Sequence, residues 1–102
     1  MSAVKVSLLY FDGCPNLKVA DERLREALAS IGRGDTDVEY RRVSTPEEAE
    51  ARRFRGSPTV LVDGRDPFLD RESPVGLSCR VYRTPDGLTG SPTVEQLVEV
   101  LR

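Results

Sequence analysis

The feature that most restricts the fold is a strand-like segment followed at once by a helix-like one. Residues 4–10 begin with alternation and end as an apolar run, a pattern typical of a strand in the middle of a sheet. Asp12-Gly13 breaks the run, and Pro15 suits the first turn of a helix because its missing N–H would have no partner there. Helical spacing continues through the apolar residues Leu17, Ala20, Leu24, Ala27, Leu28 and Ile31. Gly32 ends this helix.

The alternation of strand and helix continues beyond that glycine. Residues 36–43 predict a second strand, and the mixed polarity of both its faces favours an edge position. The capping box at 45–48 begins a short helix that runs to about Phe54. Residues 59–62 predict a third strand, rich in β-branched side chains.

The last third of the chain predicts a long loop, a strand and a helix. Residues 65–78 form a polar loop that is too long for a tight hairpin, residues 79–83 predict a fourth strand, and residues 84–87 a turn. Ser91 or Thr93 caps the last helix, whose apolar face is made of Val94, Leu97, Val98 and Leu101. The predicted order is therefore β-α-β-α-β-β-α, an α/β domain.

The pentapeptide Gly-Ser-Pro-Thr-Val occurs twice, at residues 56–60 and at residues 90–94. The first copy leads into a predicted strand and the second into a predicted helix. We therefore interpret the recurrence as coincidence and not as an internal repeat.

Composition excludes several classes of function. The 102 residues are enough for a single domain, 1–102. The net charge of −2 argues against nucleic-acid binding, and the apolar runs are too short to span a membrane. No secretory signal is visible, so we expect a cytoplasmic protein. Two cysteines and no histidine exclude most zinc sites and histidine-based triads, so we expect neither a metal nor a cofactor.

Cys14 is the leading candidate for chemistry. It lies at the start of the first predicted helix, where free backbone N–H groups and the helix dipole favour a thiolate. The alternative is a small buried side chain, since free cysteine is often buried. Asp12 could relay a proton but also suits the Asp-Gly turn, and Asn16 could donate to a substrate or be solvated.

Two short motifs resemble the thioredoxin superfamily. They are Phe11-Asp12-Gly13-Cys14-Pro15-Asn16 after the first strand and Ser57-Pro58-Thr59 before the third. The resemblance implies a four-stranded mixed sheet flanked by three helices. It also implies that Cys14 is a catalytic thiol facing a cis-proline at Pro58. Leu17 stands where dithiol members have a second cysteine, so the chain resembles a monothiol, glutaredoxin-like variant.

The resemblance also implies where a substrate binds. Around a cis Pro58, the Ser57 carbonyl and the Thr59 N–H would present a backbone edge to a substrate. Arg52, Arg53 and Arg55 could receive the carboxylates of a glutathione- or mycothiol-like cosubstrate, with Arg55 the best of the three. For the three arginines together we favour a solvated helix end, where cations suit the dipole, with Arg55 as the exception.

Cys79 begins the predicted fourth strand. In the resembling fold that strand starts at the opposite pole, which places Cys79 roughly 20 Å from the active end, too far to bridge to Cys14. We expect two free thiols in a reducing cytoplasm.

These residues predict thiol-disulfide exchange, or a reduction that depends on a small thiol, through a mixed disulfide at Cys14. The partner would be a low-molecular-weight thiol or a protein disulfide. One alternative is a non-catalytic binding module that uses the proline-loop groove. The other is a soft-metal thiol protein related to organomercurial lyases, with Cys14, Cys79 and Asp12 supplying two thiolates and a carboxylate. The expected separation of Cys79 and the lack of an extra helical domain speak against it.

Overall fold

A computed structural model gives the structure and describes residues 4–69 and 74–102. The first half contains four elements, which are β1 (Val6–Tyr10), α1 (Leu17–Ser30), β2 (Val38–Arg42) and α2 (Pro46–Arg52). The second half contains four more, which are β3 (Thr59–Val62), β4 (Tyr82–Thr84), β5 (Gly87–Thr89) and α3 (Val94–Leu101). Among these described residues, no helix is both long and apolar enough to cross a membrane.

Three strands form the main sheet, in the order β2-β1-β3. β1 pairs in parallel with β2, with Val6 opposite Val38, and antiparallel with β3, with Leu9 opposite Thr59. The central position of β1 and the edge position of β2 are both confirmed. β1 is buried along most of its length, as its apolar run predicts.

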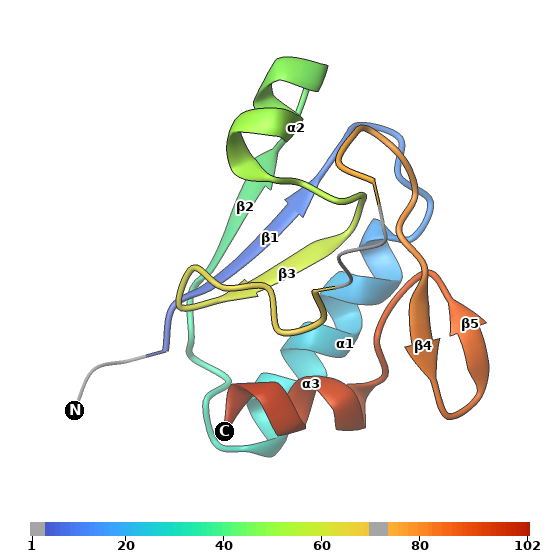
Figure 1. Ribbon diagram of the computed structural model, residues 1–102. Coiled ribbons are helices and arrows are strands. Elements are labelled where there is room, and N and C mark those ends of the chain that lie inside the picture. The colour runs from blue at the N-terminus through green and yellow to red at the C-terminus, as the bar shows by residue number, and fades with distance from the viewer. Residues whose placement is uncertain (1–3, 70–73) are drawn as a thin grey trace.

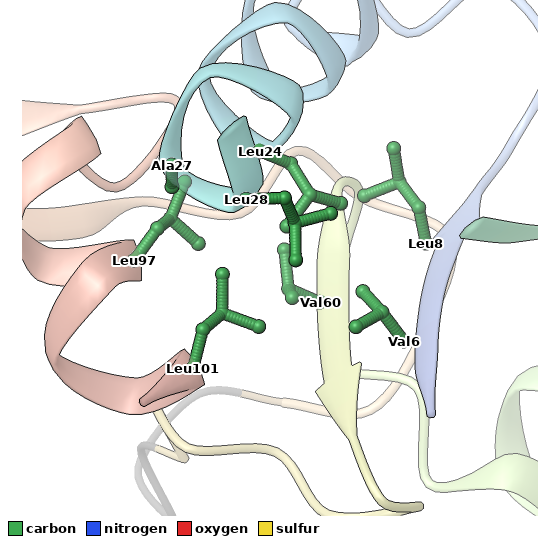
Figure 2. Packing of buried hydrophobic residues seen from close by; sticks show 8 residues of the cluster. All are labelled: Val6, Leu8, Leu24, Ala27, Leu28, Val60, Leu97 and Leu101. Atoms are coloured by element: carbon green, nitrogen blue, oxygen red, sulfur yellow. The ribbon is translucent and has the colours of Figure 1, made fainter. Parts of the chain in front are cut away.

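The helices cover both faces of this sheet. Figure 1 shows α1 and α3 on one side and α2 on the other. Figure 2 shows side chains of α1 and α3 pointing toward those of β1 and β3. This larger core contains Val6, Leu8, Leu24, Ala27, Leu28, Val60, Leu97 and Leu101. The smaller core under α2 contains Leu9, Val43, Ala49 and Phe54.

The starts of α2 and α3 follow the capping rules, whereas α1 begins after Pro15 and has no side-chain cap. Thr45 caps α2, and Thr93, not Ser91, caps α3 through a capping box with Gln96. α1 begins at Leu17, two residues after Pro15, and its N-cap Asn16 makes no side-chain capping bond. Cys14 therefore lies in a turn just before the helix.

The expected four-stranded sheet is wrong. Tyr82–Thr84 does not join β3 but pairs with Gly87–Thr89 in a separate two-stranded sheet, which Figure 1 shows beside the main one. The physical reason is local: the predicted turn leaves only two residues between the strands, so β4 forms its ladder with the segment that follows it. The sequence analysis missed β5. Residues 70–73 of the predicted loop lie outside the described residues.

Candidate functional site

The sheet brings two loops to one of its ends. Because β3 is antiparallel to β1, the first residue of β3, Thr59, lies beside Leu9 near the end of β1. The loop that carries Cys14 leaves β1 at this end, and the loop that carries Pro58 enters β3 there. The two motifs of the sequence analysis therefore meet at the same end of the sheet.

Cys14 lies in a pair of turns between β1 and α1. Its N–H donates to the Phe11 carbonyl over 3.3 Å, and its own carbonyl accepts from the Leu17 N–H over 3.4 Å. The residue is half-buried and its thiol is free. A free thiol that is partly open to solvent can react with a disulfide in solution.

The Ser57–Pro58 peptide bond is cis, as predicted. The open backbone edge expected at Ser57 is not there, however. The Ser57 N–H donates to the Ser78 carbonyl over 2.8 Å, and the Ser57 carbonyl accepts from the Arg80 N–H over 2.9 Å. The segment 78–80 thus occupies both backbone groups of Ser57, and a substrate cannot pair with them.

Cys79 is where the sequence analysis was most wrong. It forms an isolated parallel bridge with Ser57, and so it lies at the Cys14–Pro58 end of the sheet and not at the opposite pole. The expectation failed because it extended β3 by an antiparallel hairpin, whereas the chain returns from residue 74 and passes Ser57 in the parallel sense. Cys79 is exposed and its thiol is free.

Gly56 makes this close passage possible. Its φ of +113° lies in a region that side chains rarely adopt. A Cβ at this position would come within 3.0 Å of the Arg80 Cβ and the Ser78 carbonyl oxygen. Glycine is therefore needed here both for the backbone conformation and for the space.

Tyr82 also belongs to the site, although the sequence analysis gave it no role. Its buried hydroxyl donates to the Pro58 carbonyl. Burial raises the pKa of Tyr82, the Arg80 charge lowers it, and the Asp66 carboxylate raises it further, as a negative charge on Cys14 would. The hydroxyl is thus held in its protonated, donating form, close enough to Cys14 for a charge there to act on it.

Arg80 is a second residue that was missed. Its side chain is only 3% exposed and forms a two-pronged ion pair with Asp66, with distances of 2.6 and 3.2 Å. It also donates to Thr59 Oγ1 over 3.2 Å and lies 4.7 Å from the centre of the Tyr82 ring. Arg80 and Tyr82 are buried while Cys79 and Val81 are exposed, so the buried face is the one that carries an arginine, the opposite of what the apolar pattern favours.

Two other candidates are held by structural contacts. Asp12 forms an exposed ion pair of 3.1 Å with Arg42 at the end of β2. Asn16 packs so closely on Gly90 that a Cβ on that glycine would overlap its side chain. Both residues therefore have a structural reason to be where they are.

The three arginines near the end of α2 line a cavity of about 380 Å³ on the α2 side of the sheet. Arg52 and Arg53 are exposed, and Arg55 is half-buried. The walls also include the apolar Leu9, Phe54 and Leu61 and the acidic Asp66. The exposure of Arg52 and Arg53 agrees with a solvated helix end, while the half-buried Arg55 is the most enclosed of the three. Cys14 is not among the residues that line this cavity.

No group of three or more histidine, cysteine or acidic residues in the described part of the chain could hold a metal ion. The search for relatives adds no constraint: no family model, no curated protein and no solved structure matches the chain.

Proposed function

We propose that the protein carries out thiol-disulfide exchange through Cys14. The observation that carries the proposal is the free, half-buried Cys14 thiol at the end of the sheet where the Pro58 loop enters β3 and Tyr82 bonds the Pro58 carbonyl. The Cys14 thiolate attacks one sulfur of a substrate disulfide. A mixed disulfide forms on Cys14, and the other half of the substrate leaves as a thiolate that takes a proton from water.

The surrounding residues hold the site in place. The Tyr82 hydroxyl fixes the Pro58 carbonyl, and Arg80 ties Tyr82 and Thr59 to Asp66. A thiol gains reactivity when the groups around it are positioned before the substrate arrives. The buried ion pair therefore stabilises the loop that carries Pro58.

The substrate in this proposal is a low-molecular-weight disulfide or a protein disulfide, and the cosubstrate is a carboxylate-bearing thiol of the glutathione or mycothiol type. The cavity beside Arg52, Arg53 and Arg55 supports this choice, because guanidinium groups bind carboxylates in a forked geometry. The apolar floor of the cavity suits the carbon chain of such a molecule. The thioredoxin-like fold remains part of this proposal.

One observation supports the soft-metal alternative, and another speaks against it. Cys79 lies at the Cys14 end, so two thiolates could converge on a soft metal. However, Asp12, which would have to protonate carbon in organomercurial chemistry, is paired with Arg42. Thiol exchange needs only the thiols and is therefore the better-supported function. The non-catalytic binding module predicts that Cys14 reacts no faster than an ordinary exposed thiol.

The test compares two variants that each retain one thiol, Cys14→Ser and Cys79→Ser. We expect Cys79→Ser to react with glutathione disulfide and release one equivalent of glutathione, and Cys14→Ser to react far more slowly. The measurement is the rate of thiol release, followed by peptide mapping of the mixed disulfide. Equal slow rates for both variants would overturn the proposal in favour of the binding module.

A further inference from the structure

We propose that Cys79 is the resolving thiol of this site, so that the monothiol motif works as a dithiol with partners far apart in sequence. The inference rests on the proposed function of Cys14. The inference assigns a role to Cys79, which sequence spacing alone places at the end of the fold opposite Cys14.

The first observation is the path of the segment 78–80. The two hydrogen bonds between Ser57 and this segment flank Cys79, so its main chain lies one strand spacing, about 4.8 Å, from that of Ser57. Residues paired in this way project their side chains from the same face. Cys79 therefore lies beside Ser57, which immediately precedes the cis-proline at the end of the sheet where the Cys14 loop leaves β1.

The second observation is the Ser57 hydroxyl. It is fully buried, and its Oγ has no hydrogen-bond partner among the described residues. Buried hydroxyls are almost always bonded, so an unpartnered one calls for a functional explanation. The Cys79 sulfur can supply a partner during the reaction, because its main chain is paired with that of Ser57 and a thiolate accepts a hydrogen bond from a hydroxyl.

The third observation is the difference in exposure of the two thiols. Cys14 is half-buried and Cys79 is exposed. The exposed thiol can approach a mixed disulfide from the solvent side. Neither thiol is engaged in a disulfide in the structure, so both are available.

Cys79 resolves the mixed disulfide in a second exchange step. After Cys14 has formed a mixed disulfide with one half of the substrate, the Cys79 thiolate attacks the Cys14 sulfur. The bond between Cys14 and the substrate sulfur breaks, the Cys14–Cys79 disulfide forms, and the substrate half leaves as a thiolate and takes a proton. The substrate disulfide has gained two electrons and the protein has lost two. Two molecules of a small thiol restore the reduced protein and leave as their own disulfide.

The experiment treats the reduced protein with glutathione disulfide at low protein concentration and measures intact mass without reduction. We expect the natural sequence to lose the mass of two hydrogens and to keep no glutathione. Cys79→Ser should keep one glutathionyl group on Cys14. Ser57→Ala should slow the second step about tenfold, the rate change expected for one hydrogen bond to a charged sulfur.

Each contrary outcome has a distinct meaning. A stable glutathionyl group on Cys14 of the natural sequence, with Cys79 still free, would overturn the role of Cys79 and leave the proposed function standing. A Cys14 that does not react in any variant would overturn both. Crosslinked dimers without an intramolecular bridge would also overturn the resolving role, and size-exclusion chromatography separates that case.

Discussion

The two copies of Gly-Ser-Pro-Thr-Val have the same sequence and different structures. In the first copy the Ser57–Pro58 bond is cis and the next residues enter β3; in the second, the Ser91–Pro92 bond is trans and the next residues enter α3. Both prolines are fully buried. Five identical residues are therefore not enough to fix the local backbone, which must be decided by what packs on them.

The packing partners differ in kind. The first copy is covered by Arg80. The Arg80 backbone N–H bonds the Ser57 carbonyl, and the Arg80 Cβ packs on Gly56. The Arg80 guanidinium bonds the Thr59 hydroxyl. The second copy is covered by α1. Arg23 donates to the Pro92 carbonyl over 3.2 Å, and the Asn16 side chain fills the space over Gly90. An ion pair holds one copy and a helix surface holds the other.

The largest effect is expected from removing the ionic partner of the first copy. Asp66→Ala leaves the buried Arg80 guanidinium without a countercharge, which should lower the free energy of unfolding by about 3–5 kcal/mol. Urea unfolding would measure this. Asp66→Asn retains most of the shape of the aspartate side chain and should recover part of the lost free energy of unfolding.

The matched control for this prediction is Glu99→Ala, which breaks the exposed pair with Arg102. Its effect should stay within about 0.5 kcal/mol. A similar small effect for Asp66→Ala would mean that Arg80 does not hold the first copy in place.

An intermediate effect is expected at the two glycines. Gly56→Ala combines an unfavourable φ with overlap against backbone atoms, and should cost about 2–4 kcal/mol. Gly90→Ala meets only the Asn16 side chain, which can rotate away, and should cost about 1 kcal/mol.

A double variant sharpens the comparison of the glycines. Asn16→Ala combined with Gly90→Ala should be more stable than the sum of the single effects predicts, because the overlap has been removed. Strict additivity in thermal or urea unfolding would contradict the packing that we describe at the second copy.

The smallest effects on stability are expected at the two serines, and the two effects should differ in sign. Ser57→Ala removes a buried hydroxyl without a partner in the described structure and should leave stability unchanged or raise it by up to about 1 kcal/mol. Ser91→Ala removes a hydrogen bond of 2.9 Å to the Pro92 carbonyl and should lower the free energy of unfolding by about 1 kcal/mol. Calorimetry on the pair would detect this, and equal losses at both serines would contradict the contrast.

The parts of the fold that the sequence predicted are those that local patterns determine. The three-and-four spacing along α1 and the capping residues Thr45 and Thr93 specify helices from neighbours alone. The apolar run of β1 indicated a central strand because only a central strand is buried on both faces. In the site, the cis bond at Pro58 was predicted only from the resemblance of two short motifs to a known superfamily.

The rest depended on contacts between distant residues. Arg80 finds Asp66 fourteen positions earlier, and Tyr82 finds Pro58 twenty-four positions earlier. No spacing rule marks such pairs. Cys79 was misplaced for the same reason, since nothing in its neighbours shows that its strand passes Ser57 in parallel and then turns away.

The main core also has a consequence for the protein during synthesis. Val6 and Leu8 belong to the same core as Leu97 and Leu101, so the core that contains the first strand closes only when the last helix is in place (Figure 2). Until the ribosome has released Leu101, the apolar face of α1 has no α3 to cover it. Contacts between such distant residues slow folding, and exposed apolar surface favours aggregation. The apolar face of α1 is therefore left uncovered for as long as the chain lacks α3.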